Sequence, residues 1–517
     1  MIPFSCDGHQ RAFVTSSSSS SRPSPCLSVA VSPPTEDQYL LEDDDDDEEY
    51  DFDALLAKKE EWMQELQRLA KTSSKDPTAV TQVQSVFDEM FEAYVTTEES
   101  TMWPTVDVYN LVIETHAYSK DEHGADEAER ILGRMEDKTV EFIARPNLET
   151  YQTVMDAWAM RRNPEKAQKV LERFEKRFGE AEGTAIVPLY NKLIKAYGMT
   201  GDAQAAESIF RGLLEEEEEY KKANNKSWVQ TMKAYASLPD GTEKVHSLFR
   251  EMLRAYRMGE EDYVPKTDAF NTLIRSLGKT KGGAEETEAM LFEMIEKFRG
   301  GDEDSRPNAE TFRLVIAAQS RGRNASGAKI EQLLQIQEGL YDTTKAEDLK
   351  LDAWLGNVAL QAIARSRDKK KAIRAKRVIE RMKKADDELN EPSVRSYYTL
   401  LSACAYTEGT PEDNFEAFQI AVDALKELRE SLDKEPDSAC FGMFLKACAN
   451  LMPDNRKRDG VAENIFRKCC AEGLVNDFVL AEFERASSDA LQLEVLGGFL
   501  DDNVRLPSEW SRKVETR

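Results

Sequence analysis

Apolar and polar positions follow one another with the spacing of amphipathic helices, and the same pair of helices recurs about nine times. The first helix of each pair opens with an aromatic residue and has apolar residues three and four positions later, as Val112 and Ile113 follow Tyr109. From Tyr109 to Phe312 the gaps between successive aromatic residues are 42, 39, 38, 42 and 42 residues. A period of this size predicts a solenoid, in which each pair buries its apolar face against its neighbours. The eight clear pairs begin at Tyr109, Tyr151, Tyr190, Trp228, Phe270, Phe312, Tyr397 and Phe441.

A small residue lies six positions after the aromatic residue in all eight clear pairs. A bulky side chain there would hold neighbouring helices apart, so we expect the first helices to pack closely at this position. In the second helix, a small residue is followed by apolar residues at three, four and seven positions, as in Ala128, Ile131, Leu132 and Met135. The small residues of the first helices are Thr115, Ala157, Ala196, Ala234, Ser276, Ala318, Ala403 and Ala447.

A proline often ends the linker before a first helix, where it disfavours helix at the residue before it. Together with the two helix patterns, this phased proline resembles the pentatricopeptide repeat family, whose unit opening is matched well at 146–151 and 307–312. The resemblance covers about residues 77–480. It implies an all-α fold, an α-solenoid of stacked antiparallel helix pairs that form a right-handed superhelix. The prolines are Pro104, Pro146, Pro265, Pro307, Pro392 and Pro436.

Two features depart from the family pattern. These units are longer than the family's usual length of about 35 residues, and the extra residues are largely acidic, at 215–219, 260–262 and 302–304. We expect them to form outward loops or helix extensions. In the seventh unit, the register is ambiguous among Trp354, Leu355 and Gly356.

The chain divides into four parts. Residues 1–52 begin with a serine-rich leader that has no acidic residue from Gly8 to Thr35, which resembles an organelle transit peptide, although a plain disordered tail is the alternative. The acidic run at 43–49 that follows should stay unfolded as a linker. Residues 53–105 are expected to form N-terminal capping helices, 106–477 about nine repeats, and 478–517 a C-terminal capping helix and tail. The leader favours a mitochondrion or plastid, with the cytoplasm as the alternative.

Charge and cysteine content limit the classes of function. The formal net charge is −28, and the 12 acids and two arginines of residues 1–52 leave −18 on the rest. This acidity counts against a generic polyanion binder but allows a local basic groove. No stretch of 18 apolar residues is present, so no membrane span is expected. The seven cysteines are odd in number and lack a CxxC motif, which is typical of reduced packing cysteines in a non-secretory compartment.

The resemblance implies a site on the first helices, which in this family line a concave face and read one base of single-stranded RNA per unit. The residue just after the aromatic acts there with the last residue of the unit. Carried over, the positions are three amide pairs, which the family associates with pyrimidines, and several mixed positions. The simpler alternative is that the asparagines cap or brace the turns between units. The positions are Asn110 with Asn147, Asn191 with Asn224, Asn271 with Asn308, Gln152 with Ile186, Val229 with Lys266, Tyr398 with Asp437, and Arg313.

Some of the charges near these positions oppose RNA binding and others favour it. The residue three before each code position normally helps to sandwich the base. Four of the six residues at this position are acids, which would repel a phosphate-bearing strand. The six residues are Asp107, Glu149, Pro188, Lys226, Asp268 and Glu310. Six cations are expected to contact phosphates: Lys192, Lys195, Lys226, Lys233, Lys266 and Arg275.

Catalytic motifs are missing from the sequence. His116 occupies a helical position that Trp158 and Tyr197 fill in sister units, so we interpret it as a packing residue. No HxE with CxxC, P-loop or GxGxxG is present, and we expect no enzyme activity, cofactor or metal. The sequence therefore predicts an organelle RNA-binding protein that acts in RNA processing, stability or translation. The alternative is a scaffold of the same fold with a basic protein or ribonucleoprotein partner.

Overall fold

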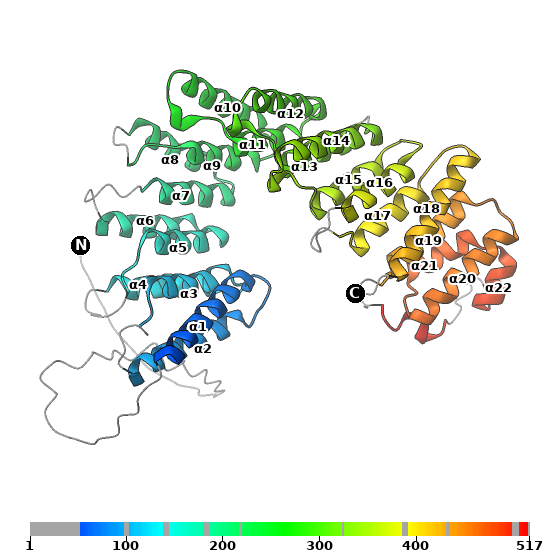
Figure 1. Cartoon of the computed structure of the whole chain (residues 1–517), viewed down its shortest axis with the longest axis horizontal. Helices are drawn as coiled ribbons and strands as arrows, with labels where there is room; N and C mark the ends of the chain where they lie inside the picture. Colours follow the sequence, from blue (N-terminus) through cyan, green and yellow to red (C-terminus); the bar gives the residue numbers. More distant parts are fainter. Residues whose placement is uncertain are drawn as a thin grey trace, which may run out of the picture. The chain divides into compact units, whose positions relative to one another are not determined.

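The computed structural model describes residues 52–97, 103–137, 144–178, 186–216, 220–322, 325–384, 391–430, 435–498 and 506–514. In these ranges the chain forms twenty-two α-helices that follow one another as hairpins (Figure 1). The predicted all-α stack of helix pairs is confirmed. None of the described helices is long and apolar enough to cross a bilayer.

The helices fall into two compact units. The first unit, Met1–Glu180, contains α1 (Phe52–Thr72), α2 (Ala79–Thr97), α3 (Val106–Tyr118), α4 (Gly124–Glu136), α5 (Leu148–Met160) and α6 (Pro164–Phe178). The division lies inside the stretch that the sequence presents as one array of repeats.

The second unit, Ala181–Arg517, holds the other sixteen described α-helices. They are α7 (Val187–Thr200), α8 (Ala203–Glu215), α9 (Asn225–Ala236), α10 (Thr242–Arg257), α11 (Thr267–Leu277), α12 (Gly283–Arg299), α13 (Ala309–Arg321), α14 (Gly327–Thr344), α15 (Ala353–Arg365), α16 (Lys371–Lys384), α17 (Val394–Ala405), α18 (Pro411–Glu430), α19 (Ser438–Leu451), α20 (Arg456–Glu472), α21 (Asp477–Ala486) and α22 (Asp489–Leu496).

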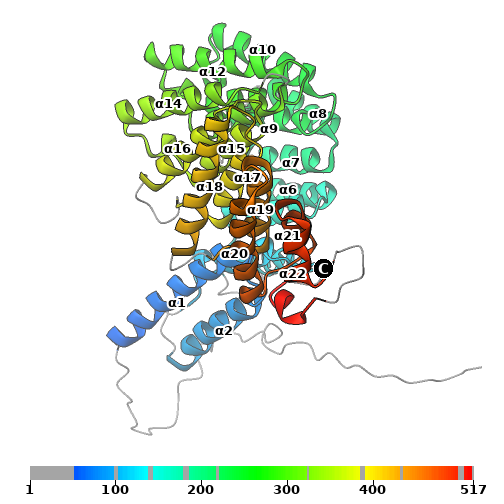
Figure 2. The same ribbon diagram turned by 90° about the vertical axis from the view of Figure 1, so that its right-hand side faces the viewer.

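Within each unit, a first helix packs on its own second helix and on the first helix of the next hairpin, as α7 packs on α8 and α9. In the second unit, the second helices α10, α12, α14, α16 and α18 form an outer layer over the first helices (Figure 2). The residue at the sixth position after the aromatic is buried in each clear repeat, for example Ala157 at 0% exposure and Ala318 at 2%. The predicted close packing is present there, because a Cβ added to Gly198 would lie 2.8 Å from the Cβ of Ala234.

The register of the seventh repeat follows from the N-caps of the first helices. In the eight clear repeats, the cap lies four residues before the aromatic residue, as Asn147 precedes Tyr151. The cap of α15 is Asp352, so Gly356 holds the aromatic position. The side chain of Met382 takes the space of the missing ring, since a Cβ on Gly356 would lie 2.6 Å from its sulfur.

Two of the three acidic insertions form compact 3₁₀ turns in the described residues. Glu261–Tyr263 and Glu303–Ser305 are such turns, and Glu347–Leu349 is a third in the following repeat. Each turn buries its last residue: Tyr263 is 4% exposed, Ser305 2% and Leu349 0%. The expected outward loops are present at 260–262 and 302–304 as short turns, whose acids Glu261, Asp262, Glu303 and Asp304 are exposed while the residue after each pair is buried. Part of the third insertion, 217–219, lies outside the described residues.

Ion pairs join neighbouring second helices within each of the two units. Arg173 of α6 pairs with Glu129 and Glu136 of α4, and Arg211 of α8 pairs with Glu251 of α10. Similar pairs join Lys329 with Glu288, Arg374 and Arg377 with Glu331, Arg381 with Glu338, and Lys383 with Glu427.

The C-terminal part folds back on the last hairpins. The 3₁₀ turn Ser508–Ser511 brings Trp510 against Phe466, with 5.7 Å between ring centroids. Val475 donates its backbone N–H to the Trp510 carbonyl at 2.8 Å. The end of the chain thus contains α21, α22 and this turn, where the sequence suggested a single helix and a tail.

Candidate nucleic-acid interface

The three asparagine pairs of the predicted site are brought together between neighbouring first helices. The Nδ2 atom of Asn271 donates to Oδ1 of Asn308 at 3.3 Å, and the Oδ1 atom of Asn271 accepts from the hydroxyl of Thr311 at 2.7 Å. Asn308 is also the N-cap of α13, where its side chain accepts from the Thr311 backbone N–H. The bracing role that the sequence left open is therefore present. Base reading by the same amides stays a prediction.

The other two pairs repeat this bridge with small differences. Asn110 donates to Asn147 at 3.4 Å and also to Glu149 at 3.4 Å, so both of its N–H donors have partners within the protein. Asn191 donates to Asn224 at 3.3 Å, but its buried Oδ1 has no hydrogen-bond partner within the described residues. Asn191 and Asn271 therefore each keep one N–H donor that these bridges do not use.

Sequence reasoning missed a fourth bridge, in the seventh repeat. Asn357 follows Gly356 and its Oδ1 accepts from the hydroxyl of Ser396 at 2.7 Å. Ser396 belongs to the capping box of α17, whose N-cap is Ser393. The cap spacing, four residues from Asp352 to Gly356, is the signal that could have placed Asn357.

The mixed pairs do not form such bridges in the described residues. Ile186 and Lys266 are N-caps whose side chains make no cap hydrogen bond. Asp437 accepts from the Cys440 backbone N–H at 2.8 Å, which caps α19. Gln152 is half-buried on α5.

The six predicted phosphate contacts differ in their surroundings. Lys226 and Lys233 of α9 are exposed and make no ion pair within the described residues. Lys266 pairs with Asp304 at 3.2 Å, and Arg275 pairs with Glu310. Lys192 and Lys195 are half-buried on α7.

Arg313 is held by an acid and by an aromatic ring. Its guanidinium pairs with Glu310 and lies 3.4 Å from the ring centroid of Trp354. Arg313 is 8% exposed, whereas Trp354 is 62% exposed. The Gly356 register puts Trp354 three residues before Asn357, at the position that sandwiches a base in the family. Sequence reasoning missed Trp354 because the register was ambiguous.

The equivalent face of the first unit is acidic. Asp107 and Glu114 lie on α3, and Glu149 and Asp156 lie on α5. Burial raises the pKa of Glu114, and the nearby charge of Glu149 adds to this effect. The charge of this face thus differs between the first helices of the two units.

His116 is 5% exposed, and neither ring nitrogen has a hydrogen-bond partner within the described residues. Burial lowers its pKa. In sister repeats the same position donates to an acid of the preceding hairpin, as Trp158 does to Glu129 at 2.9 Å. Packing accounts for the position of His116.

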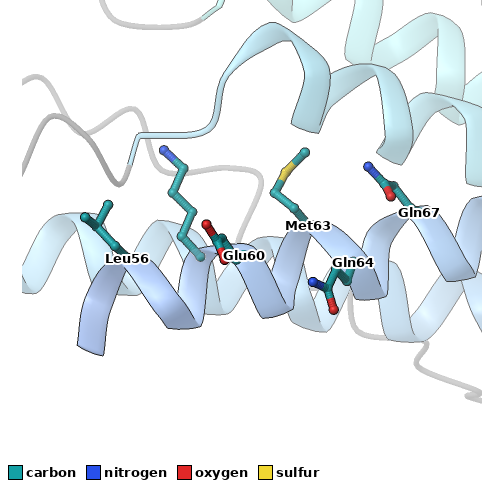
Figure 3. A pocket seen from close by; sticks show the side chains of 6 residues that line it. Leu56, Glu60, Met63, Gln64 and Gln67 are labelled. Atoms are coloured by element: carbon teal, nitrogen blue, oxygen red, sulfur yellow. The ribbon is translucent and has the colours of Figure 1, made fainter. Parts of the chain in front are cut away.

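A shallow pocket lies along one side of α1 (Figure 3). All of its lining residues come from this one helix, and Leu56 is 38% exposed. No second element contributes a polar group to the lining, so the pocket lacks the convergent side chains of a ligand site. The lining residues are Leu56, Lys59, Glu60, Met63, Gln64 and Gln67.

Hairpins that follow one another in sequence and pack first helix on first helix define an α-solenoid repeat protein. The family model of the PPR repeat matches residues 149–177 and 189–217, which cover α5 with α6 and α7 with α8. The chain therefore contains pentatricopeptide repeats.

Comparison with curated protein sequences gives no significant match. Among solved structures, the chain is similar to two crystal structures of the pentatricopeptide repeat protein PPR10 in complex with an 18-nt psaJ RNA element. Each has 17% identity, a TM-score of 0.51 and coverage of 84% of this chain and 56% of that chain. The crystal structure of PPR10 from maize has 16% identity, a TM-score of 0.40 and coverage of 83% and 53%. The chain spans just over half the length of these structures.

Proposed function

We propose that the protein binds single-stranded RNA along the first helices α7 to α15 of its second unit. It would act in RNA processing, stability or translation in a mitochondrion or plastid, without catalysis of its own. The observation that carries this proposal is the pair of asparagine bridges, Asn191–Asn224 and Asn271–Asn308, on either side of the exposed lysines of α9. The fold of PPR10, which has been crystallised with an RNA element, supports it.

The bridges favour particular base edges. In the Asn271–Asn308 bridge the Oδ1 atom of Asn308 accepts from Asn271 and from Thr311, while Oδ1 of Asn271 accepts from Thr311. The carbonyl oxygens are thus occupied, and the amide N–H groups that stay available are donors. Donors suit the adjacent acceptors O2 and N3 of cytosine better than the N3–H of uracil. We therefore expect a preference for cytosine at the repeat of the Asn271–Asn308 bridge.

Trp354 would contribute without reading sequence. One face of its ring is covered by Arg313, and the side chain is 62% exposed. Stacking of a base on an aromatic ring contributes about 1–3 kcal/mol and tolerates any base. The seventh repeat would therefore hold a nucleotide mainly by stacking.

The test is anisotropy of labelled oligocytidylate, oligouridylate and oligoadenylate with the full chain. We expect binding with a preference for oligocytidylate, and Asn271→Ala should reduce that preference by roughly tenfold, since a good bidentate contact contributes about 1–3 kcal/mol. Lys233→Ala should weaken all three oligonucleotides alike and lower the salt slope by about 0.7. Exposed Lys384 of α16 provides the control, Lys384→Ala. Absence of binding to all three would contradict the proposal.

A second candidate function is supported by the acidic face of the first unit. Asp107, Glu149 and their neighbours suit a basic segment of a protein partner rather than a phosphate backbone. In a pull-down with a lysine- and arginine-rich peptide, Glu149→Gln should reduce capture if this function is the right one. If the chain captures the peptide and binds none of the oligonucleotides, the scaffold function is favoured.

A further inference from the structure

The two ends of the hairpins α11–α16 carry opposite charges. The 3₁₀ turns between hairpins expose three Glu-Asp pairs: Glu261 and Asp262, Glu303 and Asp304, Glu347 and Asp348. The turns within hairpins, at the opposite end, carry cations: Lys279, Lys281, Arg321, Arg365, Arg367, Lys369 and Lys370. A phosphate-bearing strand on these hairpins is therefore repelled at one end and attracted at the other.

Two cations of the basic end form hydrogen bonds with backbone carbonyls of the preceding hairpin. Arg321 donates to the carbonyl of Gly278 at 2.9 Å, and Lys279 donates to the carbonyl of Ala236. Both acceptors lie at the C-terminus of the preceding first helix, where a cation is favourable. These two side chains brace neighbouring hairpins.

The turn between α15 and α16 is different, because four of its cations are exposed and make no ion pair within the described residues: Arg365, Arg367, Lys369 and Lys370. The one acid of this turn, Asp368, is occupied. It pairs with Arg374 at 2.8 Å and accepts from the Lys370 backbone N–H at 2.9 Å. Four cations in six residues thus face solvent without an ion pair in the described part of the chain, and the nearby acid of the next turn, Asp413, interacts with Lys369 and Lys370 through its charge alone.

The turn has a fixed shape. Ser366 donates to the Ile363 carbonyl at 2.7 Å, and the buried Lys371 donates to the Ser366 carbonyl at 3.3 Å. The start of α14 packs against it, since a Cβ on Gly327 would lie 3.1 Å from Asp368. The acids of the next turn are Glu408, Glu412 and Asp413, and the carboxylate of Asp413 is taken up by the backbone N–H and hydroxyl of Thr410.

We propose that the turn between α15 and α16 binds the phosphates of RNA nucleotides that extend beyond the first-helix face, through Arg365, Arg367, Lys369 and Lys370. This inference rests on the proposed function. Arg365 ends α15, the helix that begins next to Trp354, so a strand whose base stacks on Trp354 has these cations along the same helix. Contact with phosphates alone makes the interaction independent of base sequence.

The experiment uses the full chain and two labelled oligocytidylates, one of about 8 and one of about 20 nucleotides, a range that covers typical single-strand site sizes. The variant is the triple Arg367→Ala, Lys369→Ala, Lys370→Ala. Its matched control is the triple Arg250→Ala, Arg254→Ala, Arg257→Ala. These three arginines of α10 are exposed on the outer layer and make no ion pair in the described chain. Helicity measured by circular dichroism checks that both triples stay folded.

We expect the turn triple to weaken the longer oligocytidylate by roughly tenfold and to lower its salt slope by about 2, since each phosphate contact on a single strand contributes about 0.7. The shorter oligocytidylate and the control triple should be unaffected. Equal loss with the control triple would show a general effect of charge, and equal loss for the shorter oligocytidylate would place the contacts on the first-helix face. Either result, or no loss at all, would overturn the inference. A wild-type chain that binds neither oligocytidylate would instead refute the proposed function.

Discussion

At the scale of single residues, the asparagine bridges join two roles in one side chain. Asn147 closes the N-terminus of α5 in a capping box with Thr150, and the same Oδ1 accepts from Asn110 of the preceding repeat. Thr150 is fully buried and donates to Asn110 at 2.7 Å. A helix cap therefore also fixes how two repeats meet.

Thr150→Val tests this link with little change of shape. It removes a buried donor from both asparagines, so we expect a loss of about 1–3 kcal/mol in the free energy of unfolding. Urea denaturation followed by circular dichroism measures it. The matched control is Thr153→Val in the same helix, whose exposed hydroxyl donates to the Glu149 carbonyl and to no other atom of the described residues. Equal losses for the two variants would contradict the bridge as the cause.

His116 gives a prediction for pH. Burial lowers its pKa below the ordinary 6.5, so the unfolded chain takes up the proton first. Its contribution to stability is complete above pH 6.5, begins to be lost as the pH falls below this value, and is fully lost once the pH has fallen through the lower pKa of the folded state. His116→Gln, which copies the buried Gln319 at the same position of α13, should remove this part of the pH dependence. Urea midpoints of both proteins at pH 7.5 and 5.5 provide the measurement, and parallel shifts would count against it.

The resemblance to the pentatricopeptide repeat family predicted which asparagines pair, because its two code positions could be carried over onto this sequence. It did not predict which of them also accept from a hydroxyl, since this depends on the side chain three residues after the cap. The difference between Asn191 and Asn271 illustrates this: the hydroxyl of Thr311 reaches the Oδ1 of Asn271, whereas the Ser227 hydroxyl bonds, among the described residues, only with its capping partner Asn224. The role of Trp354 was missed because a glycine, Gly356, holds the aromatic position of the seventh repeat and left its register ambiguous.

At the scale of helices, small residues set the distance between neighbouring first helices. Ala318 is 2% exposed, and a Cβ added to Gly278 of the preceding hairpin would lie 3.1 Å from the Cβ of Ala318. Such a contact leaves no room for a branched side chain.

Ala318→Leu should therefore force α13 away from α11 and lower the free energy of unfolding by about 1–3 kcal/mol, the usual cost of overpacking. Ala289→Leu on the exposed side of α12 is the control and should change stability by less than about 0.5 kcal/mol. Thermal melts of the two variants provide the comparison. A similar melting temperature for both would show that α13 can shift without loss.

Helix pairs and their order were predictable because local spacing alone defines them. The 3₁₀ turns were not, since an acidic run gives no sign that the residue after it is buried. Tyr263, Ser305 and Leu349 share no chemical type, only a position between two hairpins. The register of the seventh repeat was ambiguous for a related reason. Gly356 has no aromatic ring to mark the position, and Met382 from the second helix fills the space that the ring would occupy.

At the scale of the whole molecule, the chain forms two units where the repeat pattern suggested one array. At the start of the second unit, the N-cap of α7 is Ile186, which has no side-chain oxygen for an asparagine bridge. The repeat pattern of aromatic and small residues runs through this position unchanged, so the division could not be predicted from that pattern.

Two units predict two steps of unfolding, because cooperativity holds within a domain rather than across domains. Thr150→Val should shift only the step of the first unit, and Ala318→Leu only the step of the second. Calorimetry of the full chain with each variant measures both steps. A single transition that both variants shift equally would mean that the chain unfolds as one cooperative body.

The opposite charges at the two ends of α11–α16 also act before any contact forms. Together they give these hairpins an electric moment directed along the helices, from the Glu-Asp pairs at 261–262, 303–304 and 347–348 toward the cations at 365–370. A polyanion diffusing toward them would experience a torque as well as an attraction, so collisions would begin already aligned. Rates of association would then decrease steeply with ionic strength, while a neutral analogue of the same strand would arrive without a favoured orientation.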